Sequence, residues 1–173
     1  MDIKILLGDC FDFDLPCDCI VTEPLYAENG IVEKILETWH PERYFIFQKL
    51  DGEVEIKGVN IKDHAFSTGK RKRFTWSARR RTPRHVGLMV EILEDVSFPE
   101  DLILDPFMGS GSTGEACAIL GRRFIGVERL KYVFENASAR LHKYGVQDLS
   151  SVSEEVRQKE LQSLKRRSVG DRV

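Results

Sequence analysis

The stretch LILDPFMGSGSTGEACAILGRRFIGVE, residues 102–128, decides the fold of this chain. It opens with an apolar run that ends at Asp105, continues through a glycine-rich turn, and closes with a second apolar run that ends at Glu128. Between the two runs we expect a helix that begins near Ser112. The order strand, turn, helix, strand is typical of a parallel sheet whose crossover connections are helices.

The glycines of this turn, at positions 109, 111 and 114, follow the pattern G-x-G-x-x-G. Glycines let the backbone approach a ligand closely, and the N-terminus of the following helix favours negative groups on that ligand. Glu128 lies 19 residues after Gly109, the spacing at which a carboxylate at the next strand end accepts hydrogen bonds from ribose hydroxyls. Two ligands fit these features, a dinucleotide and S-adenosylmethionine.

Two observations favour S-adenosylmethionine. Asp105-Pro106-Phe107 separates the strand from the glycines, and a carboxylate beside the turn suits an ammonium group but repels a pyrophosphate. The turn also lies late in the chain, because 45 residues follow Glu128, too few for the rest of a doubly wound sheet. The remaining strands therefore come from the N-terminal half, in a circularly permuted order.

Apolar runs bounded by turn residues predict five strands, at 3–8, 17–22, 44–50, 101–105 and 123–128. Apolar residues at helical spacing predict further helices, at 31–39, 86–96 and 130–144. The alternating segment 53–62, with a glycine at its middle, predicts a short hairpin, and the polar tail 146–173 is compatible with a helix. We therefore expect one α/β domain with a doubly wound, mostly parallel sheet.

The overall composition is that of an ordinary globular protein, with 42% hydrophobic and 31% charged residues. No apolar run reaches the length of a membrane span, and the N-terminus shows no export signal. The four cysteines have no zinc-ligand spacing, and reduced thiols are typical of a cytoplasmic protein. We expect no metal and no membrane partner.

The net charge of −2 hides a strongly basic segment, GKRKRFTWSARRRTPR, at residues 69–84. A block of cations without acids is typical of a surface that binds a polyanion, although a solvated loop has the same composition. Aromatic residues among the cations favour the first interpretation, since they can stack on bases. The predicted nucleic-acid contacts are Lys70, Arg71, Lys72, Arg73, Trp76, Arg79, Arg80 and Arg81.

A family resemblance appears when the region around the glycine turn is read to residue 141. DPFMGSGSTGEACAILGRRFIGVERLKYVFENASARL resembles the block DPF-x-GSGTT…LGR-x-x-IG-x-E…RL of DNA amino-methyltransferases with permuted motif order. RHVGLMVEIL at 84–93 and GDC at 8–10 are similar to two further elements of that family. The resemblance implies a Rossmann-like, S-adenosylmethionine-dependent methyltransferase fold. It also implies the cofactor-binding residues Asp9, Cys10, Asp105, Pro106, Phe107, Gly109, Ser110, Gly111, Ser112 and Glu128.

The same resemblance divides the chain into functional parts. It implies a methyltransferase domain over 1–145, with a catalytic half at 1–50, a basic recognition insert at about 51–83 and a cofactor half at 84–145. The expected substrate is double-stranded DNA. Because the insert is short, we expect modest sequence discrimination or a contribution from a second subunit, as in a homodimer.

The catalytic motif of the family corresponds here to TEPLY, residues 22–26. In the family an acid, Asn or Ser precedes two prolines and an aromatic ring; the acid and a proline carbonyl accept the N–H bonds of a base amino group, and the ring stacks on a flipped base. Glu23, Pro24 and Tyr26 are the predicted catalytic residues, and the acid favours N6 of adenine as the target. Leu25 replaces the second proline, so a protein that binds cofactor or DNA without reacting is the alternative.

Two further hypotheses concern other chemistry. Methylation of RNA or protein would use similar amino-nitrogen chemistry. An oxidoreductase with a nicotinamide cofactor would use the same glycine pattern.

Overall fold

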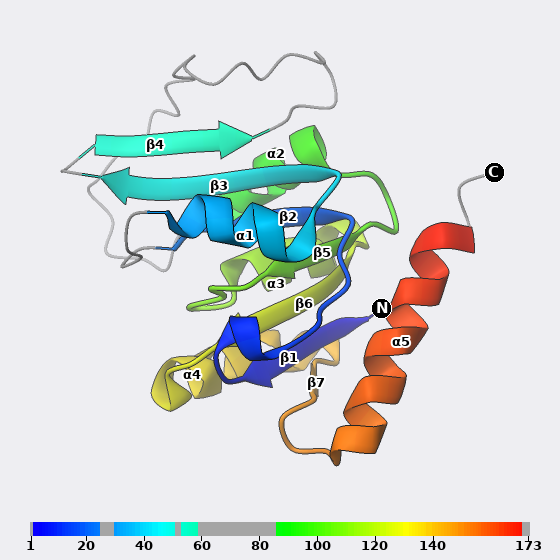
Figure 1. Ribbon diagram of the computed structural model, residues 1–173. Helices are drawn as coiled ribbons and strands as arrows, with labels where there is room; N and C mark the ends of the chain where they lie inside the picture. Colours follow the sequence, from blue (N-terminus) through cyan, green and yellow to red (C-terminus); the bar gives the residue numbers. More distant parts are fainter. Residues whose placement is uncertain (1, 25–29, 51–52, 59–85, 171–173) are drawn as a thin grey trace.

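A mixed sheet in the order β4-β3-β2-β5-β6-β1-β7 organises the chain (Figure 1). The structure, a computed structural model, describes residues 2–24, 30–50, 53–58 and 86–170. In this part of the chain the strands are β1 (Ile3–Leu7), β2 (Cys19–Thr22), β3 (Arg43–Leu50), β4 (Glu53–Gly58), β5 (Leu102–Asp105), β6 (Arg123–Glu128) and β7 (Gln147–Asp148). All neighbouring strands pair in parallel except β4, which is antiparallel to β3. The predicted α/β fold with a mostly parallel sheet is confirmed.

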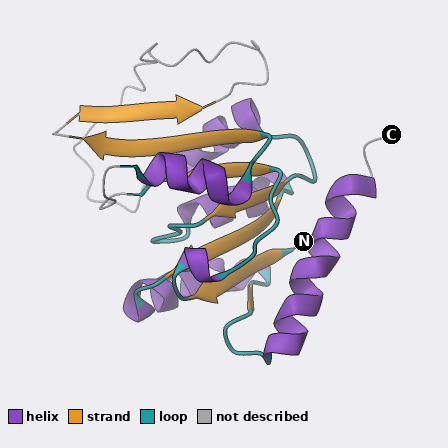
Figure 2. Cartoon of the chain, viewed as in Figure 1, coloured by secondary structure: helices purple, strands orange, loops and turns teal. Residues whose placement is uncertain are grey.

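Helices connect the strands and cover both faces of the sheet (Figure 2). They are α1 (Ile31–Trp39), α2 (Val86–Val96), α3 (Ser112–Leu120), α4 (Lys131–Leu141) and α5 (Glu154–Gly170), with short 3-10 turns η1 (Cys10–Asp12) and η2 (His142–Tyr144). The predicted helices at 31–39 and 86–96 have the observed bounds. The helix predicted over 130–144 ends at Leu141 and continues as the 3-10 turn η2.

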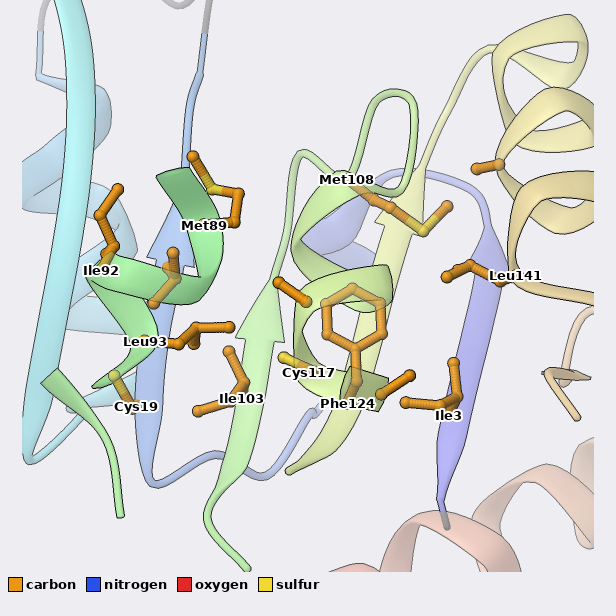
Figure 3. Packing of buried hydrophobic residues seen from close by; sticks show 14 of the residues in the cluster. Ile3, Cys19, Met89, Ile92, Leu93, Ile103, Met108, Cys117, Phe124 and Leu141 are labelled. Atoms are coloured by element: carbon orange, nitrogen blue, oxygen red, sulfur yellow. The ribbon is translucent and has the colours of Figure 1, made fainter. Parts of the chain in front are cut away.

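The two faces of the sheet have separate apolar cores. Helices α2, α3 and α4 cover one face, where Met89, Cys117 and Leu141 belong to the same apolar cluster as Phe124 of β6 (Figure 3). Helices α1 and α5 cover the other face. Strand β5 contributes to both cores, since Ile103 faces the first while its neighbours Leu102 and Leu104 face the second. Burial of both faces explains why this strand is a continuous apolar run in the sequence.

The structure describes only the first part of the hairpin predicted within 53–62. Residues 53–58 form one strand, β4, which pairs with β3 through contacts such as Leu50 with Glu53 and Phe45 with Gly58. Gly58 therefore ends the described strand, opposite Phe45. The predicted second arm, 59–62, lies outside the described residues.

The segment after residue 145 adds to the sheet and to one core. Strand β7 pairs with β1, and α5 buries Leu161 and Leu164, which are 2% and 1% exposed. The ammonium group of Lys4 lies 2.7 Å from the carboxylate of Glu160, and the guanidinium of Arg123 donates to the carbonyl oxygen of Leu164 at 3.1 Å. The helix expected in the polar tail is thus present, and two of its leucines are core residues. No helix among the described residues is long and apolar enough to cross a bilayer.

Candidate active site

The carboxyl ends of β2 and β5 lie side by side at the centre of the sheet. From β2 the chain runs through α1 to β3 on one side, and from β5 it runs through α3 to β6 on the other side. Neighbouring strands whose connections diverge in this way leave a crevice at their carboxyl ends, where open α/β sheets bind ligands. Glu23 follows β2 and Asp105 ends β5, so two of the predicted site residues lie at this crevice.

A cavity of about 70 Å³ lies in the crevice, and both strand ends line it. Six of the predicted site residues contribute to its wall, namely Glu23, Asp105, Phe107, Gly109, Ser110 and Ser112. Residues not predicted from the sequence contribute the rest, namely Val21, Thr22, Met89, Met108 and Thr113. Of these, Thr22 could have been predicted from the sequence, because its hydroxyl directly precedes the acid of the motif and can donate a hydrogen bond to a carboxylate at a neighbouring strand end. Met89 was indistinguishable from a core residue of an amphipathic helix.

Asp105 is a buried carboxylate, 3% exposed, at the wall of this cavity. The hydroxyl of Thr22 donates to its Oδ1 at 2.7 Å, and the backbone N–H of Phe107 donates to the same oxygen at 3.2 Å. Burial raises the pKa of Asp105 from 3.8 to about 6, while hydrogen bonds from Thr22 and Thr113 oppose the shift. The nearby charge of Glu23 raises this pKa further. The site therefore carries a carboxylate that is costly to ionise unless a cation accompanies it.

The glycine turn brings backbone close to the cavity. Gly109 and Gly111 have φ angles of 54° and 77°, in the left-handed region that favours glycine. Gly114 has another role, because a Cβ atom there would lie 2.8 Å from the ring of Phe124 on β6. The first two glycines shape the turn, and the third permits close packing of α3 on the sheet, as in nucleotide-binding turns.

Glu128 joins the glycine turn to the start of α4. Its Oε2 accepts the backbone N–H of Gly109 at 3.1 Å, and its Oε1 accepts the backbone N–H of Leu130 at 2.8 Å. Each oxygen keeps a second lone pair for a ligand hydroxyl. The carboxylate predicted to bind ribose is thus oriented by the same turn that lines the cavity.

Asp9 and Cys10 follow β1, the strand beside β6. The backbone N–H of Gly8 donates to the carbonyl oxygen of Glu128 at 3.1 Å, which joins the two strand ends. The carboxylate of Asp9 accepts the N–H of Phe11 at 3.0 Å and caps η1. Burial raises the pKa of the Cys10 thiol to about 12, so this side chain is a neutral core group. Neither residue lines the cavity, and they extend the row of predicted cofactor residues along the carboxyl edge of the sheet.

The structure describes only some of the residues that are predicted to bind the base or the DNA. Pro24 is buried and Glu23 is partly exposed. Leu25 and Tyr26 lie outside the described residues. All of the predicted DNA contacts also lie outside them, namely Lys70, Arg71, Lys72, Arg73, Trp76, Arg79, Arg80 and Arg81. Among the residues that are described, no group of three His, Cys, Asp or Glu side chains could hold a metal ion.

A family model of DNA methylases of the N6/N4 type matches residues 33–139, well over half of the chain. The chain belongs to this family. The match covers the glycine turn and Glu128 but begins after Glu23, so membership in the DNA methylase family does not bear on the altered catalytic motif.

Similar curated proteins are type II methyltransferases. The chain is 32% identical to the type II methyltransferase M2.MboI of Moraxella bovis over 104 residues, which are 60% of this chain and 36% of that protein. It is 34% identical to M2.LlaDCHI of Lactococcus lactis subsp. cremoris over 86 residues, which are 50% of this chain and 32% of that protein. The chain thus spans about a third of the length of these relatives.

Solved structures of DNA methyltransferases share the fold. The structure of M1.HpyAVI aligns with a TM-score of 0.57 and 25% identity, over 80% of this chain and 98% of that one. The cytosine-N4-specific PvuII DNA methyltransferase aligns with a TM-score of 0.53 at 11% identity, over 95% of this chain and 93% of that one. The expected methyltransferase type of the α/β fold is therefore confirmed.

Proposed function

We propose that this chain transfers a methyl group from S-adenosylmethionine to the exocyclic amino group of a DNA base, with N6 of adenine as the target. One observation carries the proposal: Glu23 and Asp105 line a single cavity at the central crevice of the sheet. A donor held by the glycine turn would there face a base held by the segment after β2. Family membership supports the same reaction.

The residues around the glycine turn fit S-adenosylmethionine. Asp105, buried and hydrogen-bonded on one oxygen by two donors, suits an ammonium group, because a cation would relieve the cost of its ionisation. Glu128 has lone pairs for ribose hydroxyls, and Gly109 and Gly111 leave room for close approach. When bound, the cofactor supplies a methyl group on a sulfonium, so the reaction needs no metal.

On the base side the chain would act on the amino nitrogen. In adenine its lone pair is delocalised into the ring, which makes it a poor nucleophile. The Glu23 carboxylate and the Pro24 carbonyl would accept its two N–H bonds, favour tetrahedral geometry and stabilise the positive charge that develops. Tyr26 would stack on the flipped base, and the basic segment 69–84 would hold DNA phosphates.

A second candidate function follows from the departures in TEPLY. Glu23 is one methylene longer than the Asp of the family motif, and a misplacement of about 1 Å can lower a rate on the order of a hundredfold. Leu25 replaces a proline that would fix φ. A chain that binds S-adenosylmethionine and DNA without methyl transfer, as a regulator or partner subunit, would carry these same changes.

Transfer of labelled methyl groups from S-adenosylmethionine to unmethylated double-stranded DNA tests the proposal. We expect label in N6-methyladenine after digestion to nucleosides, and loss of that label with Glu23→Ala. Glu37→Gln, an exposed acid on α1, is the matched control and should retain activity. Cofactor binding without label on DNA or RNA would favour the second candidate, and a protein that binds no S-adenosylmethionine would contradict both.

A further inference from the structure

Thr22 is a buried hydroxyl residue at the end of β2, directly before Glu23. This residue is 2% exposed, and the other residues of the strand are Cys19, Ile20 and Val21. Its hydroxyl donates to Oδ1 of Asp105 at 2.7 Å across 83 residues of sequence. The last register pair between β2 and β5 is Ile20 with Leu104, so this side-chain bond lies beyond the backbone ladder. It links the two strand ends where the crevice opens.

The bond also fixes the orientation of the Asp105 carboxylate. Oδ1 accepts both from Thr22 and from the backbone N–H of Phe107, at 2.7 and 3.2 Å. Two donors on one oxygen, one from the end of β2 and one from the turn after β5, leave the carboxylate little freedom to rotate. A valine at position 22 would fill nearly the same volume in the strand, so packing alone does not account for the hydroxyl.

We propose that Thr22 is a positioning residue that aims the Asp105 carboxylate at the ammonium group of the methyl donor and couples it to the segment carrying Glu23. The inference rests on the proposed function and adds a residue to it. Thr22 acts through Asp105 and need not touch the donor.

The groups around Asp105 explain why positioning matters. The charge of Glu23 approaches from the end of β2, and Cys117 and Thr113 face it from α3. Glu23 disfavours ionisation of Asp105, whereas the hydrogen bond from Thr113 favours it. The Cys117 thiol is neutral, because burial raises its pKa well above the usual value. Removal of the Thr22 hydroxyl would leave Asp105 with one donor fewer and more easily protonated. Its Oδ1 would then be oriented by the N–H of Phe107 alone.

The test compares Thr22→Val, which removes the hydroxyl, with Thr22→Ser, which keeps it. Calorimetry would measure binding of S-adenosylmethionine and S-adenosylhomocysteine, which both carry the ammonium group, and of 5′-methylthioadenosine, which lacks it. We expect Thr22→Val to lower the affinity for S-adenosylmethionine and S-adenosylhomocysteine on the order of tenfold, because a hydrogen bond to a charged group contributes that much. Thr22→Ser should bind both ligands with an affinity near that of wild type. Binding of 5′-methylthioadenosine should be unchanged.

A pH profile separates positioning from simple stability. Wild-type binding of S-adenosylhomocysteine should weaken as the pH falls through about 6, where Asp105 takes up a proton. Without the Thr22 hydroxyl this midpoint should move upward, since the lost bond favours the ionised form. An unmoved midpoint, or equal weakening of all three ligands, would overturn the inference.

Three outcomes separate failure of this inference from failure of the proposed function. If wild type binds and transfers methyl groups while Thr22→Val behaves like wild type, the inference fails and the function stands. If wild type binds no S-adenosylmethionine, the function fails first. Should Thr22→Val and Thr22→Ala both unfold, the residue belongs to strand stability, and the inference is again overturned.

Discussion

Replacement of Asp105 by asparagine should make the protein more stable at neutral pH while weakening cofactor binding. The carboxylate is 3% exposed and sits beside the charge of Glu23, so its ionised form is poorly solvated in the folded chain. An asparagine of the same shape avoids that cost and still accepts the Thr22 hydroxyl. The ionised Asp105 would thus lower the stability of the free protein, and the cation of a bound ligand would remove that penalty.

The size of the effect follows from the pKa of Asp105, which is about 6 in the folded chain against an ordinary 3.8. At about 1.4 kcal/mol per pKa unit, ionisation costs the folded state on the order of 3 kcal/mol above pH 6. Loss of an acceptor for a second donor such as Thr113 offsets about 1 kcal/mol of the gain. We therefore expect a net stabilisation of roughly 1–2 kcal/mol at pH 7.5.

The sign of the pH dependence is opposite to that of a salt-bridged aspartate. Because the folded-state pKa is raised, the penalty is fully present above about pH 6, fades as the pH falls toward 3.8, and vanishes below it. The advantage of Asp105→Asn should accordingly shrink between pH 7.5 and pH 5.

Asp101, directly before the same strand, provides the matched control. Its carboxylate is 4% exposed but lies 2.6 Å from the guanidinium of Arg43 and accepts the N–H of Phe98 at 2.7 Å. The same substitution there removes the nearer and buried carboxylate partner of the Arg43 guanidinium, which among the described carboxylates keeps only the exposed Glu42 at 3.3 Å. We expect Asp101→Asn to destabilise the fold by about 3 kcal/mol.

Urea unfolding of wild type and both variants at pH 7.5 and pH 5 measures these changes. An Asp105→Asn variant less stable than wild type at pH 7.5, or a stabilisation of equal size at both pH values, would contradict this prediction. Calorimetry with S-adenosylhomocysteine on the same samples should show weakened binding in Asp105→Asn and unchanged binding in folded Asp101→Asn.

Two more substitutions, the first with a control, test the packing that supports the site. Gly114→Ala places a methyl group 2.8 Å from the Phe124 ring and should lower the free energy of unfolding, measured in urea, by about 1–3 kcal/mol. The control Gly87→Ala, in open space on α2, should raise it by up to about 1 kcal/mol. Leu164→Ala on α5 should lower the free energy of unfolding by roughly 2–5 kcal/mol, because the side chain is 1% exposed. A change below about 0.5 kcal/mol would show that α5 does not unfold together with the core.

The central strands were predictable because their residues are apolar on both faces. The run LILD at 102–105 can be buried only between two layers, and the glycines that follow it leave few alternatives to a tight turn before a helix. Periodicity likewise predicted α1 and α2 to the residue. Local sequence was sufficient wherever neighbouring residues alone determine the structure.

Strand β4 and the tail show where local patterns are insufficient. The alternation in 53–58 predicts a strand but does not say that it pairs with β3. Helix α5 offers a thin apolar face, and Leu161 and Leu164 become core residues only because the sheet has an uncovered surface beside α1. Both outcomes depend on partners far away in the sequence.

The sequence by itself determined the layer architecture, the glycine turn, and the identity of the carboxylates at the strand ends. Only the tertiary structure decided which of these carboxylates share a cavity and how strongly burial disfavours the ionised form of Asp105. Asp105 and Thr22 are 83 residues apart and meet because β2 and β5 are neighbours in the sheet. The raised pKa of Asp105 follows from burial, which sequence alone cannot supply, since desolvation depends on every atom packed around the group.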